Sequence, residues 1–206
     1  MLILLAGPVA TPSMETLSDD MMTRLEKGEI VVEMLSTDQP GESARASLLV
    51  RAPARHMWEV ISSCELAFVY TEGLKICEIL EDSGESAVIH QEVKTFWLMP
   101  RQEFTLEAQR VPYRFMRFNL LNGSLRAFEG SWGFFPAEQG TVVVHEVRVR
   151  APLLLPAFIV RRTLRTNMPD SLACMRALAG GSGSEKLRTD DLQRCKGPHP
   201  PPAQAQ

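Results

Sequence analysis

The strongest constraint on the fold is a series of strand-like segments that gives way, at Ala151, to one long helical pattern. Six segments of β-branched or alternating character follow one another with only short breaks between them. They are Leu74 to Leu80, Ser86 to Leu98, Gln102 to Arg110, Tyr113 to Leu121, Leu125 to Phe135 and Thr141 to Arg150. Breaks this short join neighbouring antiparallel strands, so the sequence predicts a wide antiparallel meander.

After Ala151 the spacing of large apolar residues becomes that of a helix and continues to Leu178. Gly180 and Gly181 then provide a typical C-terminal stop. We expect one long amphipathic helix, bent near Pro169 because a proline removes a backbone hydrogen bond.

The segment before the meander predicts shorter elements. Strands are expected at Glu29 to Leu35 and Ser43 to Arg51, and a helix at Ala54 to Ser62 directly after Pro53. Residues 63 to 73 fit either a second short helix or a loop, and the turn of residues 18–20 suits the N-cap of a leading helix.

Both ends of the chain differ in composition from its middle. Met1 to Ala10 is apolar but has no preceding basic residue, so it fits either a remnant of an export signal or an ordinary terminus. We assign residues 1–28 to a leader, 29–180 to the folded domain and 181–206, rich in Gly, Ser, Pro and Gln, to a disordered tail. Export would place the protein in a periplasmic or extracellular compartment. A chain that is not exported would remain in the cytoplasm.

The four cysteines form no CxxC pair, so a zinc or redox motif is not supported, and no metal or cofactor is expected. Cys64, Cys77 and Cys174 fit the pattern of small buried residues. A disulfide between Cys64 and Cys77 is the alternative if the chain is exported. The formal net charge of −3, without a basic patch, argues against nucleic acid as a partner.

Aromatic side chains gather in the fifth strand of the meander. Phe128, Trp132 and Phe134 share one parity, so they lie on one face of a strand, and Gly130 between them predicts a local hollow. Asn122-Gly123 before them suits a type I′ hairpin turn.

Three motifs make the chain resemble the START-like (SRPBCC) superfamily, which includes polyketide cyclases and coenzyme Q-binding START domains. Val50 to Ile61 looks like the strand-to-helix transition of that superfamily, with Ala-Pro before Met-Trp. The aromatic-x-Gly-x-Trp strand at 128–132 and the Gly-Thr start of the last strand at 140–141 are similar to its motifs. The proline-containing loop that related sequences often carry after the aromatic residue near Tyr70 is missing.

The resemblance covers roughly Gly28 to Ala179 and implies an α+β helix-grip fold, a curved antiparallel sheet wrapped around the long C-terminal helix. It also implies a cavity between sheet and helix that holds a hydrophobic molecule such as a lipid, sterol, quinone or polyketide. Apolar concavities with few polar groups are the usual form of small-molecule sites. The residues that we expect to contact the ligand are Gln91, Trp97, Phe128, Trp132, Phe134, His145 and Phe158.

Each of these residues also has a purely structural interpretation. Trp97 fits core packing, Gln91 an internal hydrogen bond, and His145 a hydrogen-bonded core histidine. His145 is also the one weak candidate for a general acid or base, because its unperturbed pKa lies near neutrality. Together with Gln91 and Tyr113 it forms no recognisable catalytic arrangement, and no HExxH, GxGxxG or P-loop motif is present.

The start of the long helix combines apolar residues with arginines. Such a patch could touch an anionic membrane surface transiently, or the leucines could be core and the arginines a solvated face. The residues concerned are Leu154, Phe158, Arg161, Arg162 and Arg165. The leading hypothesis is a carrier or sensor of a hydrophobic molecule. Its rivals are a polyketide cyclase or aromatase that uses His145, and a protein-interaction module with a filled core.

Overall fold

The computed structural model describes residues 18–94, 101–152, 155–181 and 184–195. Its centre is an eight-stranded antiparallel sheet in the order β1-β2-β8-β7-β6-β5-β4-β3. The strands are β1 Ile30–Leu35, β2 Glu42–Val50, β3 Leu74–Asp82, β4 Ser86–Val93, β5 Gln102–Val111, β6 Phe115–Gly123, β7 Ala127–Ala137 and β8 Gly140–Arg150. The predicted meander is therefore confirmed, and β2 closes against its last strand.

The helices are α1 Asp19–Glu26, α2 Ala54–Ser62, α3 Cys64–Tyr70, α4 Ala157–Leu178 and α5 Glu185–Leu192. Ser18 caps α1 by accepting a hydrogen bond from the Met21 amide, and Ser63 caps α3 in the same way from the Leu66 amide. Cys64–Tyr70 is a helix rather than a loop, because Ser63 both ends α2 and caps the next helix.

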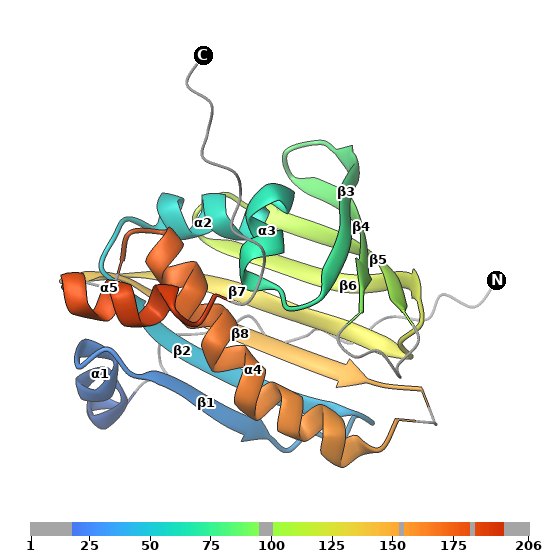
Figure 1. The fold of residues 1–206 in the computed structure, drawn as a ribbon, viewed down its shortest axis with the longest axis horizontal. Coiled ribbons are helices and arrows are strands. Elements are labelled where there is room, and N and C mark those ends of the chain that lie inside the picture. Colours follow the sequence, from blue (N-terminus) through green and yellow to red (C-terminus); the bar gives the residue numbers. More distant parts are fainter. Residues whose placement is uncertain (1–17, 95–100, 153–154, 182–183, 196–206) are drawn as a thin grey trace.

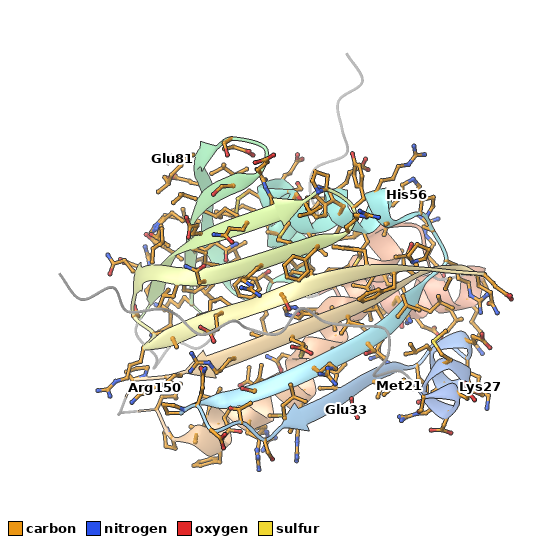
Figure 2. All side chains as sticks on the ribbon, turned by 180° about the vertical axis from the view of Figure 1, so that it is seen from behind. Met21, Lys27, Glu33, His56, Glu81 and Arg150 are labelled. Carbon is orange, nitrogen blue, oxygen red and sulfur yellow. A yellow bond between two sulfur atoms is a disulfide. The ribbon has the colours of Figure 1, made fainter. Side chains whose placement is uncertain are left out.

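The long helix α4 lies across one face of the sheet, which we call the inner face (Figure 1). It contacts β1, β2, α2 and α3 and continues through Pro169. Seen from behind, the strands lie in front of α4, and α1 sits at one corner of the sheet beside β1 (Figure 2).

Apolar side chains pack on both faces of the sheet. The larger core lies on the inner face and includes Leu48, Met57, Phe134 and Leu172. A smaller core lies on the outer face beneath α1. Its residues are Leu25, Val31, Leu49, Val142 and Val144, all at most 6% exposed.

The hairpin predicted at Asn122-Gly123 is wrong. Both residues belong to β6 and pair with Thr105 and Phe104 of β5, and the turn to β7 occupies residues 124–126. A side chain at position 123 would clash with the carbonyl oxygen of Glu103. The glycine is thus required by close approach of two strands and not by a tight turn.

The cysteines form two disulfides and are not simply small buried residues, although Cys174 is buried as predicted. Cys64 of α3 is bonded to Cys77 of β3, and Cys174 of α4 to Cys195 after α5, with Cα separations of 5.4 and 5.0 Å. The sequence analysis gives the Cys64–Cys77 disulfide as an alternative, whereas it does not predict the Cys174–Cys195 disulfide.

The prediction of a disordered tail fails for residues 184–195. Ser184 caps α5 by accepting from the Leu187 amide, and the Cys174–Cys195 disulfide ties the segment to α4. Arg176 of α4 donates to both carboxylate oxygens of Asp191, at 2.8 and 3.0 Å, and this ion pair is buried. The polar composition of residues 184–195 does not indicate the disulfide or the ion pair, because each depends on a partner in α4.

Candidate functional site

A cavity of about 350 Å³ lies between the inner face of the sheet and the helices α3 and α4. This volume is at the lower end of the range for small-molecule sites, roughly 300 to 1,000 Å³. Its floor is formed by strands and its roof by helices.

The floor is almost entirely apolar. Inward-facing positions alternate along the strands β4 to β8, as the period of two requires. They are Ile89, Gln91, Phe104, Leu106, Ala108, Met116, Phe118, Phe128, Trp132, His145, Val147 and Val149. Phe128 lies edge-on to both Phe104 and Phe118, with ring centroids 5.4 and 5.3 Å apart.

Gly130 lies in this floor, but it does not leave the hollow that its position predicts. A Cβ atom there would be 2.7 Å from Cζ of Phe118, so the ring of Phe118 already fills the space. The cavity is therefore not produced by the missing side chain of Gly130.

His145 is fixed in the floor by two contacts. Its ring stacks on Trp132, with centroids 3.7 Å apart and an angle of 10° between the planes. Its Nδ1 donates to the carbonyl oxygen of Ser131 at 3.0 Å. Burial lowers the pKa of His145 to about 4, although the hydrogen bond to Ser131 acts in the opposite direction. The imidazole is consequently neutral at neutral pH.

The roof carries most of the other polar groups. On α4 the residues Thr163, Asn167 and Ser171 recur every four positions and form one stripe that faces the cavity. Asn167 also donates to the Glu72 carboxylate at 3.3 Å. Tyr70 at the end of α3 lines the cavity too, and burial raises the pKa of its hydroxyl.

Gln91 links the cavity to the Cys64–Cys77 disulfide. Its side-chain amide nitrogen donates to the sulfur of Cys77 at 3.5 Å. The disulfide joins α3, which carries Tyr70, to the edge strand β3. A roof element is therefore covalently attached to the sheet next to a cavity residue.

The described part of the cavity wall carries no charged side chain. None of the described residues that line it is Asp, Glu, Lys or Arg. No described group of three or more His, Cys, Asp or Glu residues could hold a metal ion. Within the described ranges, none of the helices has the length and apolar character needed to cross a membrane.

Four of the seven expected ligand contacts line the cavity: Gln91, Phe128, Trp132 and His145. Phe134 does not, although it shares the face of Trp132. It packs against Trp58 of α2, with ring centroids 5.7 Å apart. Phe158 is 70% exposed on the outer side of α4, and Trp97 lies outside the described residues.

Several cavity residues were not expected from the sequence. The inward parity of β5 and β6 would have indicated Leu106, Met116 and Phe118, because these strands alternate as clearly as β7. No local pattern indicates Tyr70 or Asn167, since their place depends on how α3 and α4 pack.

The structure does not bring the possible catalytic residues together. Tyr113 is 51% exposed in the turn between β5 and β6, where its ring packs against Trp58, and it is not part of the cavity. Gln91 and His145 both line the wall, but Nδ1 of His145 is bonded to a backbone carbonyl, and no described carboxylate is bonded to it. A carboxylate-oriented acid or base is thus not formed here.

A curved sheet that holds a long C-terminal helix over an apolar cavity defines a helix-grip protein. Residues 50–176 match the family model described as polyketide cyclase / dehydrase and lipid transport. The chain belongs to this family, within the START-like superfamily. Polyketides and lipids are both largely hydrophobic, so binding of a hydrophobic molecule is the general function that membership supports.

Solved structures show the same fold at low sequence identity. A STAR-related lipid transfer protein from Xanthomonas axonopodis is 13% identical, with a TM-score of 0.61, and the match covers 73% of this chain and 93% of that one. The Zhui aromatase/cyclase from a Streptomyces species is 18% identical, with a TM-score of 0.51 and coverages of 73% and 93%. The protein TTHA0849 from Thermus thermophilus is 17% identical, with a TM-score of 0.52 and coverages of 74% and 95%. A comparison with curated protein sequences gives no match.

Proposed function

We propose that this protein binds and carries a hydrophobic small molecule, such as a lipid, sterol, quinone or polyketide-like compound, in the cavity under α4. The observation that carries the proposal is an apolar cavity without a charged side chain in its described wall. Burying the apolar surface of a ligand there contributes about 25 cal/mol per Å². A volume near 350 Å³ favours one compact molecule over a lipid with two long chains.

Native mass spectrometry of protein purified from a lipid-containing host, followed by solvent extraction, tests this proposal. The wild type should carry a lipophile that Ala108→Trp, which fills the floor of the cavity, does not. Val111→Trp is the matched control, because that position is 52% exposed at the end of the same strand. A ligand-free wild type would instead favour an interaction module, and equal loading of all three proteins would contradict this cavity as the binding site.

A polyketide cyclase or aromatase is the second candidate, favoured by the presence of both His145 and Tyr70 in the wall. Their titratable groups could exchange a proton with a bound ketone. Under this proposal His145→Ala abolishes turnover of a poly-β-ketone substrate and leaves its binding intact. Unchanged turnover in that variant would rule out His145 as acid or base.

We also propose a transient membrane contact through the start of α4. Phe158, Arg162 and Arg165 are exposed and recur on one side of the helix, next to Thr163, which is both exposed and part of the cavity wall. Arg161 differs from them because it donates to Glu42 at 2.9 Å. Leu154 lies outside the described residues.

Two disulfides support export of the protein, because such bonds persist mainly in oxidising compartments. The proposed location is periplasmic or extracellular. Sequencing the amino terminus of the protein recovered from periplasm and cytoplasm tests this directly. Recovery of an unprocessed, fully reduced chain from the cytoplasm alone would contradict it.

A further inference from the structure

The imidazole of His145 can play only one hydrogen-bonding role toward a ligand. A backbone carbonyl oxygen can only accept, so the bond to Ser131 requires the proton to be on Nδ1. In the neutral ring Nε2 then carries a lone pair and no hydrogen. Stacking on Trp132 holds this ring in place.

Nε2 has no donor from the described part of the protein. Among the described residues, the only hydrogen bond of the His145 side chain is the one from Nδ1. Nε2 is therefore available to accept a hydrogen bond, and His145 lines the cavity. A ligand carbonyl cannot provide this hydrogen bond, because two acceptors do not bond. Tyr70 can donate or accept, so it adds no discrimination.

The lack of charged side chains in the described wall restricts the ligand further. A carboxylate or phosphate that enters the cavity would lose its hydration without gaining a cationic partner, since no described lining residue is Lys or Arg. Burial of an unpaired charge is strongly unfavourable. A ligand that lies wholly inside the cavity must therefore be uncharged.

From these observations we propose that the cavity selects an uncharged hydrophobic molecule with a hydroxyl group, a phenol or an alcohol, and that Nε2 of His145 accepts the hydrogen bond from this hydroxyl. The proposal rests on the proposed binding function and specifies its ligand class. His145 is then a specificity-determining residue, and Trp132 and Ser131 position it.

Three size-matched probes test the proposal near neutral pH: 2-naphthol, 2-methoxynaphthalene and 2-naphthoate. Isothermal titration calorimetry of the wild type should show about tenfold tighter binding of the naphthol than of the ether, the effect of one net hydrogen bond. The charged naphthoate should bind at least tenfold more weakly than the ether.

His145→Phe keeps an aromatic ring beside Trp132 and removes the acceptor, so it should bind naphthol and ether equally. His90→Phe is the matched control. His90 lies on β4 with the parity opposite to Gln91, near the Thr105 hydroxyl at 3.3 Å, and it does not line the cavity. This variant should keep the tenfold preference.

Equal binding of naphthol and ether by the wild type, or a preference that survives in His145→Phe, would overturn the hydroxyl proposal and leave the binding function standing. Failure of all three probes to bind would overturn both. A second measurement does not depend on any variant: ¹⁵N NMR of the wild type should show an unprotonated Nε2 that shifts upfield with the naphthol and not with the ether. A protonated Nε2 would contradict the proposal.

Discussion

The strand β7 places two phenylalanines on the same face of the sheet, but in different surroundings. Phe134 is 5% exposed and packs against Trp58 in a region that we call the filled half of the inner core. Phe128 touches Phe104 and Phe118 and borders the cavity, in the hollow half. Residue type and strand parity are equal, so neither decides whether the space above a ring is occupied.

The difference lies in the helices above the two halves. Over Phe134, α2 contributes the large side chain of Trp58. Over the hollow half, α4 contributes the polar stripe of Thr163, Asn167 and Ser171 together with Leu164, Met168, Leu172 and Met175, and a cavity lies between them and the floor. The two halves therefore differ in which helix covers the aromatic floor.

The largest difference between the two halves is expected when Phe134 and Phe128 are each replaced by alanine. Phe134→Ala should lower the free energy of unfolding by about 3 to 5 kcal/mol, because it opens a void in a packed region. Phe128→Ala should cost about 1 to 2 kcal/mol, since its ring already borders empty space, and should weaken ligand binding. Urea unfolding of both variants measures this, and equal losses would contradict the division into halves.

The two disulfides provide a second contrast. Removing Cys174–Cys195 by alanine substitution should lower the free energy of unfolding by about 3 kcal/mol without changing affinity for a bound lipophile. Removing Cys64–Cys77 should cost a similar amount and also weaken binding, because it releases α3 and Tyr70 from the sheet. Chemical denaturation and calorimetry separate the two effects. If only the variant without the Cys174–Cys195 disulfide lost affinity, this account of the two disulfides would be wrong.

Acidic pH should lower the free energy of unfolding through His145, which lies in the hollow half. The pKa of His145 is about 4 in the folded protein and 6.5 in its ordinary state, so the unfolded chain binds more protons between these values. The contribution of neutral His145 is fully present above pH 6.5 and is lost as the pH falls through 4. The loss should reach about 3 kcal/mol. Unfolding measured against pH should be flatter in His145→Phe, and an unchanged slope would contradict this account.

The smallest effect on stability is expected at the outer side of α4. Phe158→Ser, Arg162→Glu and Arg165→Glu together should change the free energy of unfolding by less than about 0.5 kcal/mol, because all three side chains are exposed. The same variant should lose flotation with anionic liposomes at low salt. Arg161→Glu is the contrasting variant, since it breaks the ion pair with Glu42. No flotation of the wild type would exclude the membrane contact.

Periodicity predicted much of the fold because strand parity and helix spacing are local properties. The bounds of α2 agree with the prediction, and the parity of Phe128 and Trp132 placed them on the inner face. The position of Phe134 in the filled half, the exposure of Phe158 and the attachment of α5 depend on partners distant in sequence. These could not be predicted from local pattern, and neither could the role of Tyr70.

The central claim is that a ligand enters the hollow half and leaves the filled half unchanged, and methionine methyl groups report on both. Met116 and Met168 line the cavity, whereas Met57 is fully buried in the core away from it. In ¹³C-methyl-methionine NMR, adding the extracted lipophile or 2-naphthol should shift the Met116 and Met168 signals and leave Met57 in place. An equal shift at Met57, or no shift at Met116 and Met168 at saturation, would contradict the account.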